Sequence, residues 1–138
     1  LRPEFRTYQE QIIKNANSLA NTLLDEGFRL VSGGTDNHLM LLDLRPFGIT
    51  GKEMERRLDE VHITVNKNAI PNDPEKPFVT SGIRVGTPAV TTRGFTENEM
   101  KQIGHLMKLA ASDFDAKKTF INEQVEMICN RFPVYGEF

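Results

Sequence analysis

The chain has 138 residues, with 17 Lys and Arg, 19 Asp and Glu, and a formal net charge of −2 at pH 7 with neutral histidines. This length suits one domain, or part of a larger protein, and it can bury a core without disulfides or a structural metal. The charge balance leaves no basic footprint, which argues against a nucleic-acid partner. The single cysteine cannot form an internal disulfide, no Cys/His cluster has zinc-ligand spacing and no apolar run could span a bilayer. We therefore expect a soluble, cytoplasmic protein with no metal site and no membrane partner.

The N-terminal third predicts a long helix followed by two strands. Apolar residues recur at three- and four-residue steps over residues 5–24, which is typical of an amphipathic helix. Pro3 suits the first turn of this helix, and Gly27 suits its C-terminal cap. The segments 28–32 and 38–44 then predict two strands joined by a loop.

The middle of the chain predicts a short helix, a brief strand, a long loop and another strand. Residues Thr50-Gly51-Lys52-Glu53 have the spacing of a capping box, which marks the start of the helix. The β-branched segment 63–65 predicts a short strand, and residues 66–80 hold three prolines with no hydrophobic period. A loop of that length inside a compact domain is usually functional or disordered. Residues 82–87 predict the next strand.

Two helices are expected at the C-terminal end of the chain. A second capping box at residues 96–99 precedes an apolar stripe over 100–114, and a last helix carries Ile121, Val125 and Ile128. The order of elements predicts an α/β protein of the α+β kind, in which helices cover one face of a small, mostly antiparallel sheet.

Arg84 is the first candidate binding residue. In the strand Gly82-Ile83-Arg84-Val85-Gly86, period two places Ile83 and Val85 on one face and Arg84 on the other, with glycines leaving its flanks bare. A guanidinium in this position can hold a carboxylate or phosphate through two parallel hydrogen bonds. The alternative, which strand geometry alone favours, is an ordinary ion pair with an acidic residue on the outer face of the sheet.

The segment Asn66-Lys67-Asn68 is the second candidate, because it lies where a strand enters the long loop. An asparagine amide offers a paired donor and acceptor that can match the edge of a heterocycle. Asparagine is also a common turn residue, so a purely structural role is the alternative.

Three longer motifs stand out along the chain: Leu30-Val31-Ser32-Gly33-Gly34-Thr35-Asp36-Asn37-His38-Leu39, Asn66-Lys67-Asn68 with Pro71-Asn72-Asp73-Pro74, and Thr80-Ser81-Gly82-Ile83-Arg84-Val85-Gly86-Thr87-Pro88-Ala89. In this order they resemble the C-terminal third of serine hydroxymethyltransferase in its bacterial form. The resemblance runs nearly from end to end of the chain. It implies the C-terminal domain of an aspartate-aminotransferase-like, fold-type I enzyme that is a homodimer at full length. It also implies pyridoxal 5'-phosphate as cofactor, and transfer of a one-carbon unit between serine and tetrahydrofolate, giving glycine and methylenetetrahydrofolate.

The resemblance also implies roles for individual residues. Arg84 matches the family arginine that holds the α-carboxylate of serine or glycine, and Asn68 matches the asparagine that binds the pteridine ring of folate. The segment Lys76-Pro77-Phe78 matches a folate-contacting segment. Many relatives have a serine at the position of Lys76, so we assign that side chain no specific role.

The resemblance further implies an incomplete active site. The motif with the Schiff-base lysine is absent from the sequence, so we expect no catalytic residue and no activity from these residues alone. We expect residues 1–26 to form an interdomain helix and residues 27–138 the C-terminal small domain, without the large domain that binds the cofactor.

Two other functions are compatible with the residues themselves. One is a non-catalytic module that binds a small anion or a protein through residues 66–84. The other is the C-terminal domain of a related pyridoxal-phosphate aldolase or aminotransferase, whose arginine would also hold a carboxylate. Asn66-Lys67-Asn68 and the proline-rich loop argue against the second, because such enzymes bind no folate.

Overall fold

The computed structural model of the chain describes residues 3–31, 39–86 and 94–131. The described elements are the helices α1 (Pro3–Asp25), α2 (Gly51–Glu60) and α4 (Glu97–Arg131), the 3-10 turn η2 (Arg45–Phe47), and the strands β1 (Arg29–Leu30), β2 (Leu39–Asp43), β3 (Asn66–Asn68) and β4 (Gly82–Gly86). None of these helices combines the length and apolar character that crossing a membrane requires.

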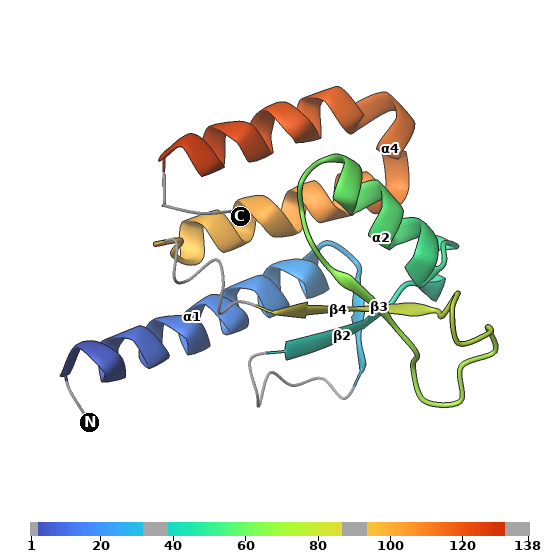
Figure 1. The fold of residues 1–138 in the computed structure, drawn as a ribbon, viewed down its shortest axis with the longest axis horizontal. Coiled ribbons are helices and arrows are strands. Elements are labelled where there is room, and N and C mark those ends of the chain that lie inside the picture. The colour runs from blue at the N-terminus through green and yellow to red at the C-terminus, as the bar shows by residue number, and fades with distance from the viewer. Residues whose placement is uncertain (1–2, 32–38, 87–93, 132–138) are drawn as a thin grey trace.

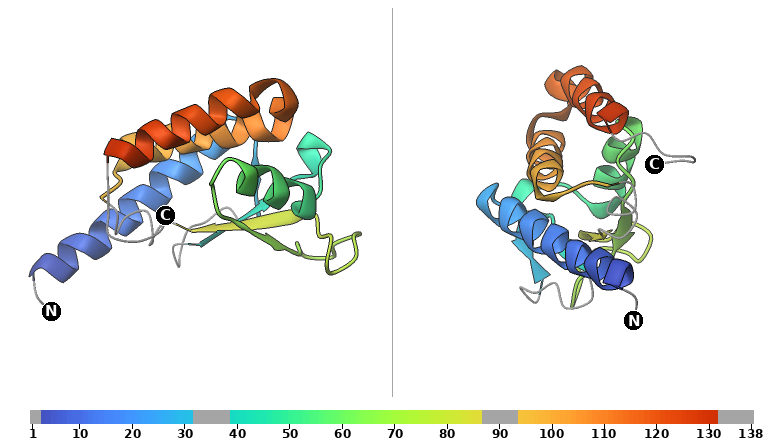
Figure 2. Two further views of the ribbon diagram at one scale, coloured as in Figure 1. Left: turned by 45° about the horizontal axis from the view of Figure 1, so that its top comes forward. Right: turned by 90° about the vertical axis from the view of Figure 1, so that its left-hand side faces the viewer.

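The four described strands form one antiparallel sheet in the order β1-β2-β4-β3. The helices lie on one side of this sheet (Figures 1 and 2). Met40 on β2 faces Val85 on β4, and Leu42 faces Ile83, so these four side chains point to the helices and are buried. This arrangement confirms the expected small antiparallel sheet with helices on one face, because period two separates an apolar face from a polar one.

Helix α1 confirms the helix expected over residues 5–24 and the cap expected at Gly27. Gly27 adopts a φ of 97°, and the amides of Gly27 and Phe28 donate to the carbonyls of Leu24 and Leu23, which is the Schellman arrangement. Ile12 and Leu23 are buried, whereas Ile13 and Leu24 remain 47% and 49% exposed. The N-terminal end of α1 projects beyond the rest of the domain (Figure 2).

Both expected capping boxes mark the start of a helix. The Thr50 hydroxyl accepts a hydrogen bond of 3.2 Å from the Glu53 amide at the start of α2. At the start of α4, the Glu99 carboxylate accepts from the amide and the hydroxyl of Thr96, both at 2.7 Å. The bonds from the two backbone amides satisfy donors that have no partner within the helix at its start.

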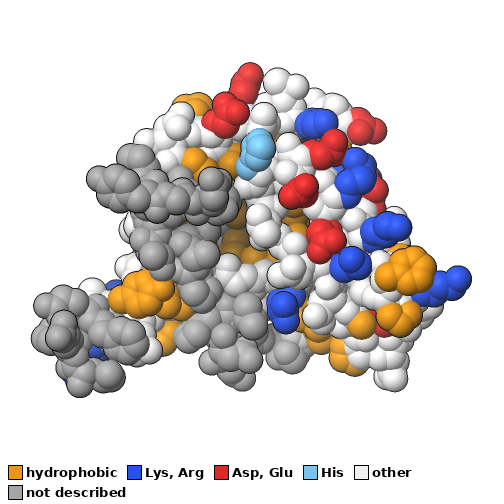
Figure 3. Space-filling view, in the orientation of Figure 1, with side chains coloured by type: hydrophobic (Ala, Val, Ile, Leu, Met, Phe, Trp, Pro, Cys, Tyr) orange, Lys and Arg blue, Asp and Glu red, His pale blue; other side chains and the backbone are white. Residues whose placement is uncertain are grey.

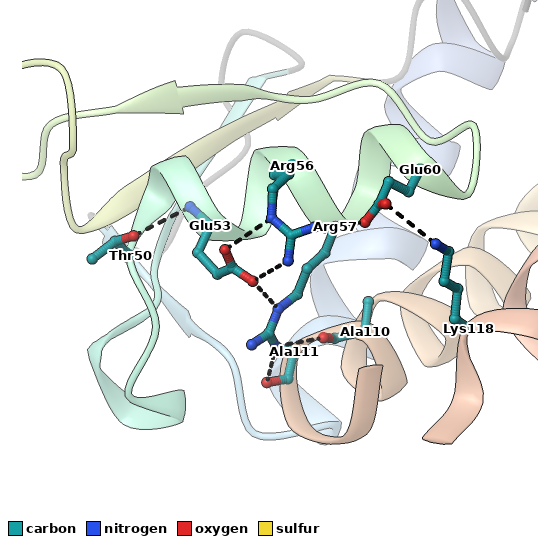
Figure 4. A network of polar contacts seen from close by, with 8 residues as sticks. All are labelled: Thr50, Glu53, Arg56, Arg57, Glu60, Ala110, Ala111 and Lys118. Carbon is teal, nitrogen blue, oxygen red and sulfur yellow. Dashed lines mark hydrogen bonds and ion pairs between the residues drawn. The ribbon is translucent and has the colours of Figure 1, made fainter. Parts of the chain in front are cut away.

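The two helices expected at the C-terminal end form α4 and meet at a kink, where Asp113 has a φ of −153°. Carbonyls that end a helical segment lack their usual donors. Arg57 of α2 supplies donors here, because its guanidinium lies 2.9 Å from the Ala110 carbonyl and 3.3 Å from that of Ala111 (Figure 4).

A network of charged side chains holds Arg57 in place. Glu53 binds Arg57 at 2.7 Å and Arg56 at 2.6 Å, and these two hydrogen-bonded guanidinium groups lower the pKa of Glu53 to about 2. Glu60 binds both Arg56 and Lys118, which adds a second link between α2 and α4 (Figure 4). Figure 3 shows side chains of both charges gathered on this part of the surface.

The prediction of a strand at residues 63–65 is wrong. Ile63 and Val65 are buried in the core, but the residues that pair with β4 are the polar Asn66–Asn68, which begin the stretch expected to be a loop. Burial rather than strand pairing therefore explains why 63–65 is rich in β-branched residues. The strand expected at 82–87 is confirmed over Gly82–Gly86, and Thr87 lies outside the described residues.

His62 ends α2 in the left-handed conformation, with a φ of 66°. Its amide donates to the Asp59 carbonyl and the next amide donates to that of Leu58, which is a helix end that glycine usually occupies. We therefore expect His62→Gly to raise the free energy of unfolding by roughly 0.5–1 kcal/mol, because glycine has no Cβ to oppose this backbone conformation.

Urea unfolding measures this effect, and His105→Gly is the matched control. His105 is an exposed residue inside α4, where glycine should lower the free energy of unfolding by about 1 kcal/mol. A decrease for both variants would contradict the role of His62 as the cap of α2.

Candidate functional site

The side of the sheet opposite the helices, called here the outer face, carries the two main candidate residues. Arg84 is paired with Leu41 of β2 on one side and with Asn66 of β3 on the other. Asn68 is paired with Gly82, so it is the diagonal neighbour of Arg84, and diagonal neighbours in an antiparallel sheet lie about 7–8 Å apart. The register therefore brings Arg84 and Asn68 together on one face.

The Arg84 side chain is exposed, and no hydrogen bond or ion pair joins it to another residue in the described ranges. The alternative expectation, an ion pair with an acidic residue of the outer face, is therefore not found among these residues. None of the described residues therefore accepts a hydrogen bond from its guanidinium.

Asp43 is the acidic residue of the outer face closest to Arg84 in register, and it is already occupied. Arg45 binds it through two nitrogens at 2.8–3.1 Å, and Arg29 lies 3.8 Å away. The hydrogen bonds from Arg45 lower the pKa of Asp43, and its side chain is only 2% exposed. These two arginines occupy the Asp43 carboxylate, so this acid of the described outer face is not available to Arg84.

Gly82 is expected to leave the space beside Arg84 open, but that space is filled. A Cβ at this position would lie 2.6 Å from the Leu42 carbonyl oxygen, 2.9 Å from that of Asn68 and 2.9 Å from the side chain of Ile70. Glycine is therefore required here for close packing. The open approach to Arg84 is not from the Gly82 side.

Asn68 and Lys67 point to opposite faces of the sheet. The Asn68 amide nitrogen donates to the Ala69 carbonyl at 2.9 Å, and its side-chain oxygen accepts no hydrogen bond from the described residues. Lys67 lies toward α2, where its amide donates to Glu55 at 2.8 Å and its ammonium lies 3.6 Å from the same carboxylate. Of these two residues, only Asn68 lies on the outer face with Arg84, beside Asn66, which is paired with Arg84 directly.

The segment Lys76-Pro77-Phe78 lies in the loop before β4, beside the start of α2. All three residues are exposed, Phe78 by 60%, and the Lys52 ammonium lies 5.7 Å from the centre of the Phe78 ring. The Lys76 carbonyl accepts from the amides of Val79 and Thr80, which closes a turn. No hydrogen bond in the described part of the chain connects this turn to Asn68 or Arg84.

Asp73, which sequence reasoning did not single out, organises the loop between β3 and β4. Its carboxylate accepts four hydrogen bonds of 2.7–3.1 Å, from the amides of Ile70, Glu75 and Ser81 and from the Ser81 hydroxyl. Partial burial opposes the charged form, but these hydrogen bonds outweigh it and lower the pKa of Asp73 to about 2. The sequence signal was the Asp73-Pro74 pair, because an aspartate that binds the amide two residues on is typical of such turns.

These features define a class of protein. The chain is a small α+β domain with an arginine and an asparagine amide on the outer face of an antiparallel sheet, and the arginine has no ion-pair partner among the described residues. Comparisons with known proteins then identify the family. The family model described as serine hydroxymethyltransferase matches residues 1–107, so the chain belongs to the serine hydroxymethyltransferase family.

Curated relatives agree with this assignment. The chain is 59% identical over 138 residues to serine hydroxymethyltransferase 1 of Cupriavidus pinatubonensis, covering 99% of the chain and 33% of the relative. It is 57% identical over 137 residues to the serine hydroxymethyltransferase of Dechloromonas aromatica, covering 97% of the chain and 33% of the relative. The chain thus spans about a third of the length of these relatives, and it corresponds to their C-terminal domain, as the resemblance implied.

We expect Asp73→Asn to lower the free energy of unfolding by about 1–3 kcal/mol, because the amide accepts fewer and weaker hydrogen bonds than the carboxylate. Glu75→Gln is the matched control, since Glu75 is an exposed acid of the same loop whose side chain makes no hydrogen bond or ion pair to the described residues. Urea unfolding at pH 7 measures both variants, and equal stabilities would contradict the role of Asp73.

The contribution of Asp73 should also depend on pH. Because its pKa is lower in the folded protein than the ordinary value of 3.8, the stabilisation is complete above about pH 4 and is lost as the pH falls through about 2. The stability difference between the parent chain and Asp73→Asn should therefore shrink over this interval.

Proposed function

We propose that this chain is the C-terminal small domain of an enzyme that interconverts serine and tetrahydrofolate with glycine and 5,10-methylenetetrahydrofolate. In this proposal residues 1–26 form the interdomain helix and residues 27–138 form the small domain. The observation that carries the proposal is the exposed Arg84, whose charge no described residue balances. The chain alone lacks the rest of the active site and is inactive.

Arg84 binds the α-carboxylate of serine or glycine in this proposal. A planar guanidinium and a carboxylate form two parallel hydrogen bonds, which fix the orientation of the amino acid as well as its position. Because Arg45 and Arg29 neutralise Asp43, no acid of the described outer face competes with the substrate for Arg84. The same neutralisation also removes a charge that would repel the substrate carboxylate.

Asn68 binds the pteridine ring of the folate in this proposal, with Pro77 and Phe78 as further folate contacts. The position of Asn68 beside Arg84 in the register supports this role, because the one-carbon unit passes between the amino acid and the folate. Lys76 contributes its backbone carbonyl to the turn, and its side chain is assigned no contact with the folate.

Pyridoxal 5'-phosphate, which acts as an electron sink when bound, is assigned to the part of the enzyme outside this chain. Holding it covalently requires a buried lysine with a lowered pKa. All eight lysines of the chain lie in the described ranges, and none of them is buried. The residues present here therefore do not fit a covalent cofactor site, and their contribution is to bind and orient the two substrates.

The face of α1 that carries Ile13 and Leu24 is assigned a contact with the large domain. Ile13 and Leu24 are about half exposed on α1, although apolar side chains on an isolated domain are more stable when covered. A homodimer of the full-length enzyme would complete the assembly.

We expect Arg84→Ala to reduce kcat/KM for serine by about 30-fold or more, corresponding to roughly 2–5 kcal/mol. The test uses a full-length enzyme in which this chain is joined to the remaining two thirds of the Cupriavidus pinatubonensis relative. Arg131→Ala, on the exposed end of α4, is the control and should leave activity unchanged. If Arg84→Ala turned over serine at nearly the parental rate, the role of Arg84 in binding the substrate carboxylate would be wrong.

Asn68→Ala should instead raise KM for tetrahydrofolate in the same enzyme, with little change in KM for serine. The reason is that Asn68 contacts the folate and Arg84 the amino acid. Equal effects of both variants on both substrates would show that the outer face is not divided in this way.

The 138-residue chain alone should neither turn over serine nor bind glycine or folate measurably by calorimetry. We also expect it to self-associate or to bind an apolar dye, because Ile13 and Leu24 would lie uncovered. Clear binding of either ligand would favour the alternative of a stand-alone binding module. A strictly monomeric chain without dye binding would contradict the contact assigned to α1.

A further inference from the structure

Thr80 has a backbone conformation that its residue type opposes. Three non-glycine residues of the described chain have positive φ, namely His62, Asn72 and Thr80. Histidine and asparagine tolerate this region, and both of these residues are exposed. Thr80 is different, because it is β-branched, has a φ of 58° and is 2% exposed. Its surroundings must therefore hold it in place.

Three hydrogen bonds hold Thr80. Its amide donates to the Lys76 carbonyl at 3.0 Å, and its carbonyl accepts from the Gly51 amide at 3.0 Å. Its hydroxyl donates to the Gly82 carbonyl, also at 3.0 Å, across the reversal of the chain. Glycine would adopt this backbone conformation without opposition, so the hydroxyl bond is what threonine adds.

The first turn of α2 packs directly on this reversal. A Cβ at Gly51 would lie 2.1 Å from the Thr80 hydroxyl oxygen and 2.2 Å from the Gly82 carbonyl oxygen, so no side chain fits there. The Lys52 amide also donates to the Val79 carbonyl at 2.9 Å. Helix α2, the turn 76–80 and the start of β4 therefore meet at Thr80.

The turn and the strand differ in how firmly they are held elsewhere. Strand β4 is paired along its length with β2 and along part of it with β3, so Arg84 is fixed by the sheet. The turn that carries Pro77 and Phe78 has its described hydrogen bonds at Lys76, Val79 and Thr80 only. Loosening Thr80 would therefore move the turn while Arg84 stays in place.

From this difference we propose that Thr80 is a positioning residue for the folate side of the site. This inference rests on the proposed function. The hydroxyl bond of Thr80 to Gly82 fixes the end of the turn 76–80, which carries Pro77 and Phe78, at the start of the strand that carries Arg84. The turn is thereby kept at one distance from the serine carboxylate. Small displacements of binding groups from their productive geometry have large effects on reaction rates.

Three substitutions separate the hydroxyl from the backbone strain. Thr80→Ser keeps the hydroxyl, Thr80→Val keeps the shape without the hydroxyl, and Thr80→Gly relieves the strain but also removes the hydroxyl. The test measures KM for serine, KM for tetrahydrofolate and the thermal midpoint in the full-length chimeric enzyme described above.

We expect Thr80→Gly to raise KM for tetrahydrofolate about tenfold while KM for serine changes less than about twofold. Its thermal midpoint should stay within about 5 °C of the parent, because relief of strain offsets the lost hydrogen bond. Thr80→Val should raise KM for tetrahydrofolate and also lower the midpoint. Thr80→Ser should match the parent in both Michaelis constants.

Parental Michaelis constants in Thr80→Gly or Thr80→Val would overturn the proposal and leave Thr80 a purely structural residue. So would a Thr80→Ser enzyme as impaired as Thr80→Gly, or equal increases in both constants. If Thr80→Gly and Thr80→Val do not fold, the Thr80→Ser enzyme decides. An increase in its KM for tetrahydrofolate would contradict the role of the hydroxyl in holding the turn, and a parental KM would support that role. Failure of Arg84→Ala and Asn68→Ala to act as expected would instead count against the proposed function itself.

Discussion

The arrangement of the candidate site depends on one partly buried, hydrogen-bonded carboxylate, that of Asp73. It accepts from the Ile70 amide, just after β3, and from the amide and hydroxyl of Ser81, just before β4. One side chain thus closes the long connection between two neighbouring strands and fixes where they begin to pair. The pairing of Asn68 with Gly82 follows from this closure, and so does the diagonal relation of Asn68 to Arg84. The same hydrogen bonds stabilise the charged carboxylate, and they lower the pKa of Asp73.

The two faces of the sheet use charge in opposite ways. Toward the helices, Lys67 is paired with Glu55, and Arg57 serves the carbonyls at the kink of α4, so these cations stabilise the fold. On the outer face, Asp43 takes Arg45 and Arg29 as partners, and Arg84 is left without an acid among the described residues. Among the described residues, no ion pair lets Arg84 stabilise the isolated domain. Its exposed position on a central strand is compatible with the role proposed for it above.

The sequence predicted those parts of the fold that depend on local patterns. Helix α1, both capping boxes and the in-and-out alternation of β4 follow from periodicity and from the short-range chemistry of helix starts. The sequence misplaced β3, because a polar edge strand shows neither alternation nor β-branched residues, whereas the buried segment 63–65 shows the latter. It placed Arg84 on the correct face, but it could not show that Ile70 covers Gly82 or that Thr80 has positive φ. Both facts arise from contacts between segments far apart in the chain.

The strand order also has a consequence for how the domain is made. β4 lies in the middle of the sheet, yet it is the last of its described strands along the chain, and it pairs with β2 some 40 residues earlier. During synthesis β3 therefore has no described strand to pair with until residues 82–86 have left the ribosome. The sheet is thus completed by a late, long-range pairing, and the strand that completes it is the one that bears Arg84.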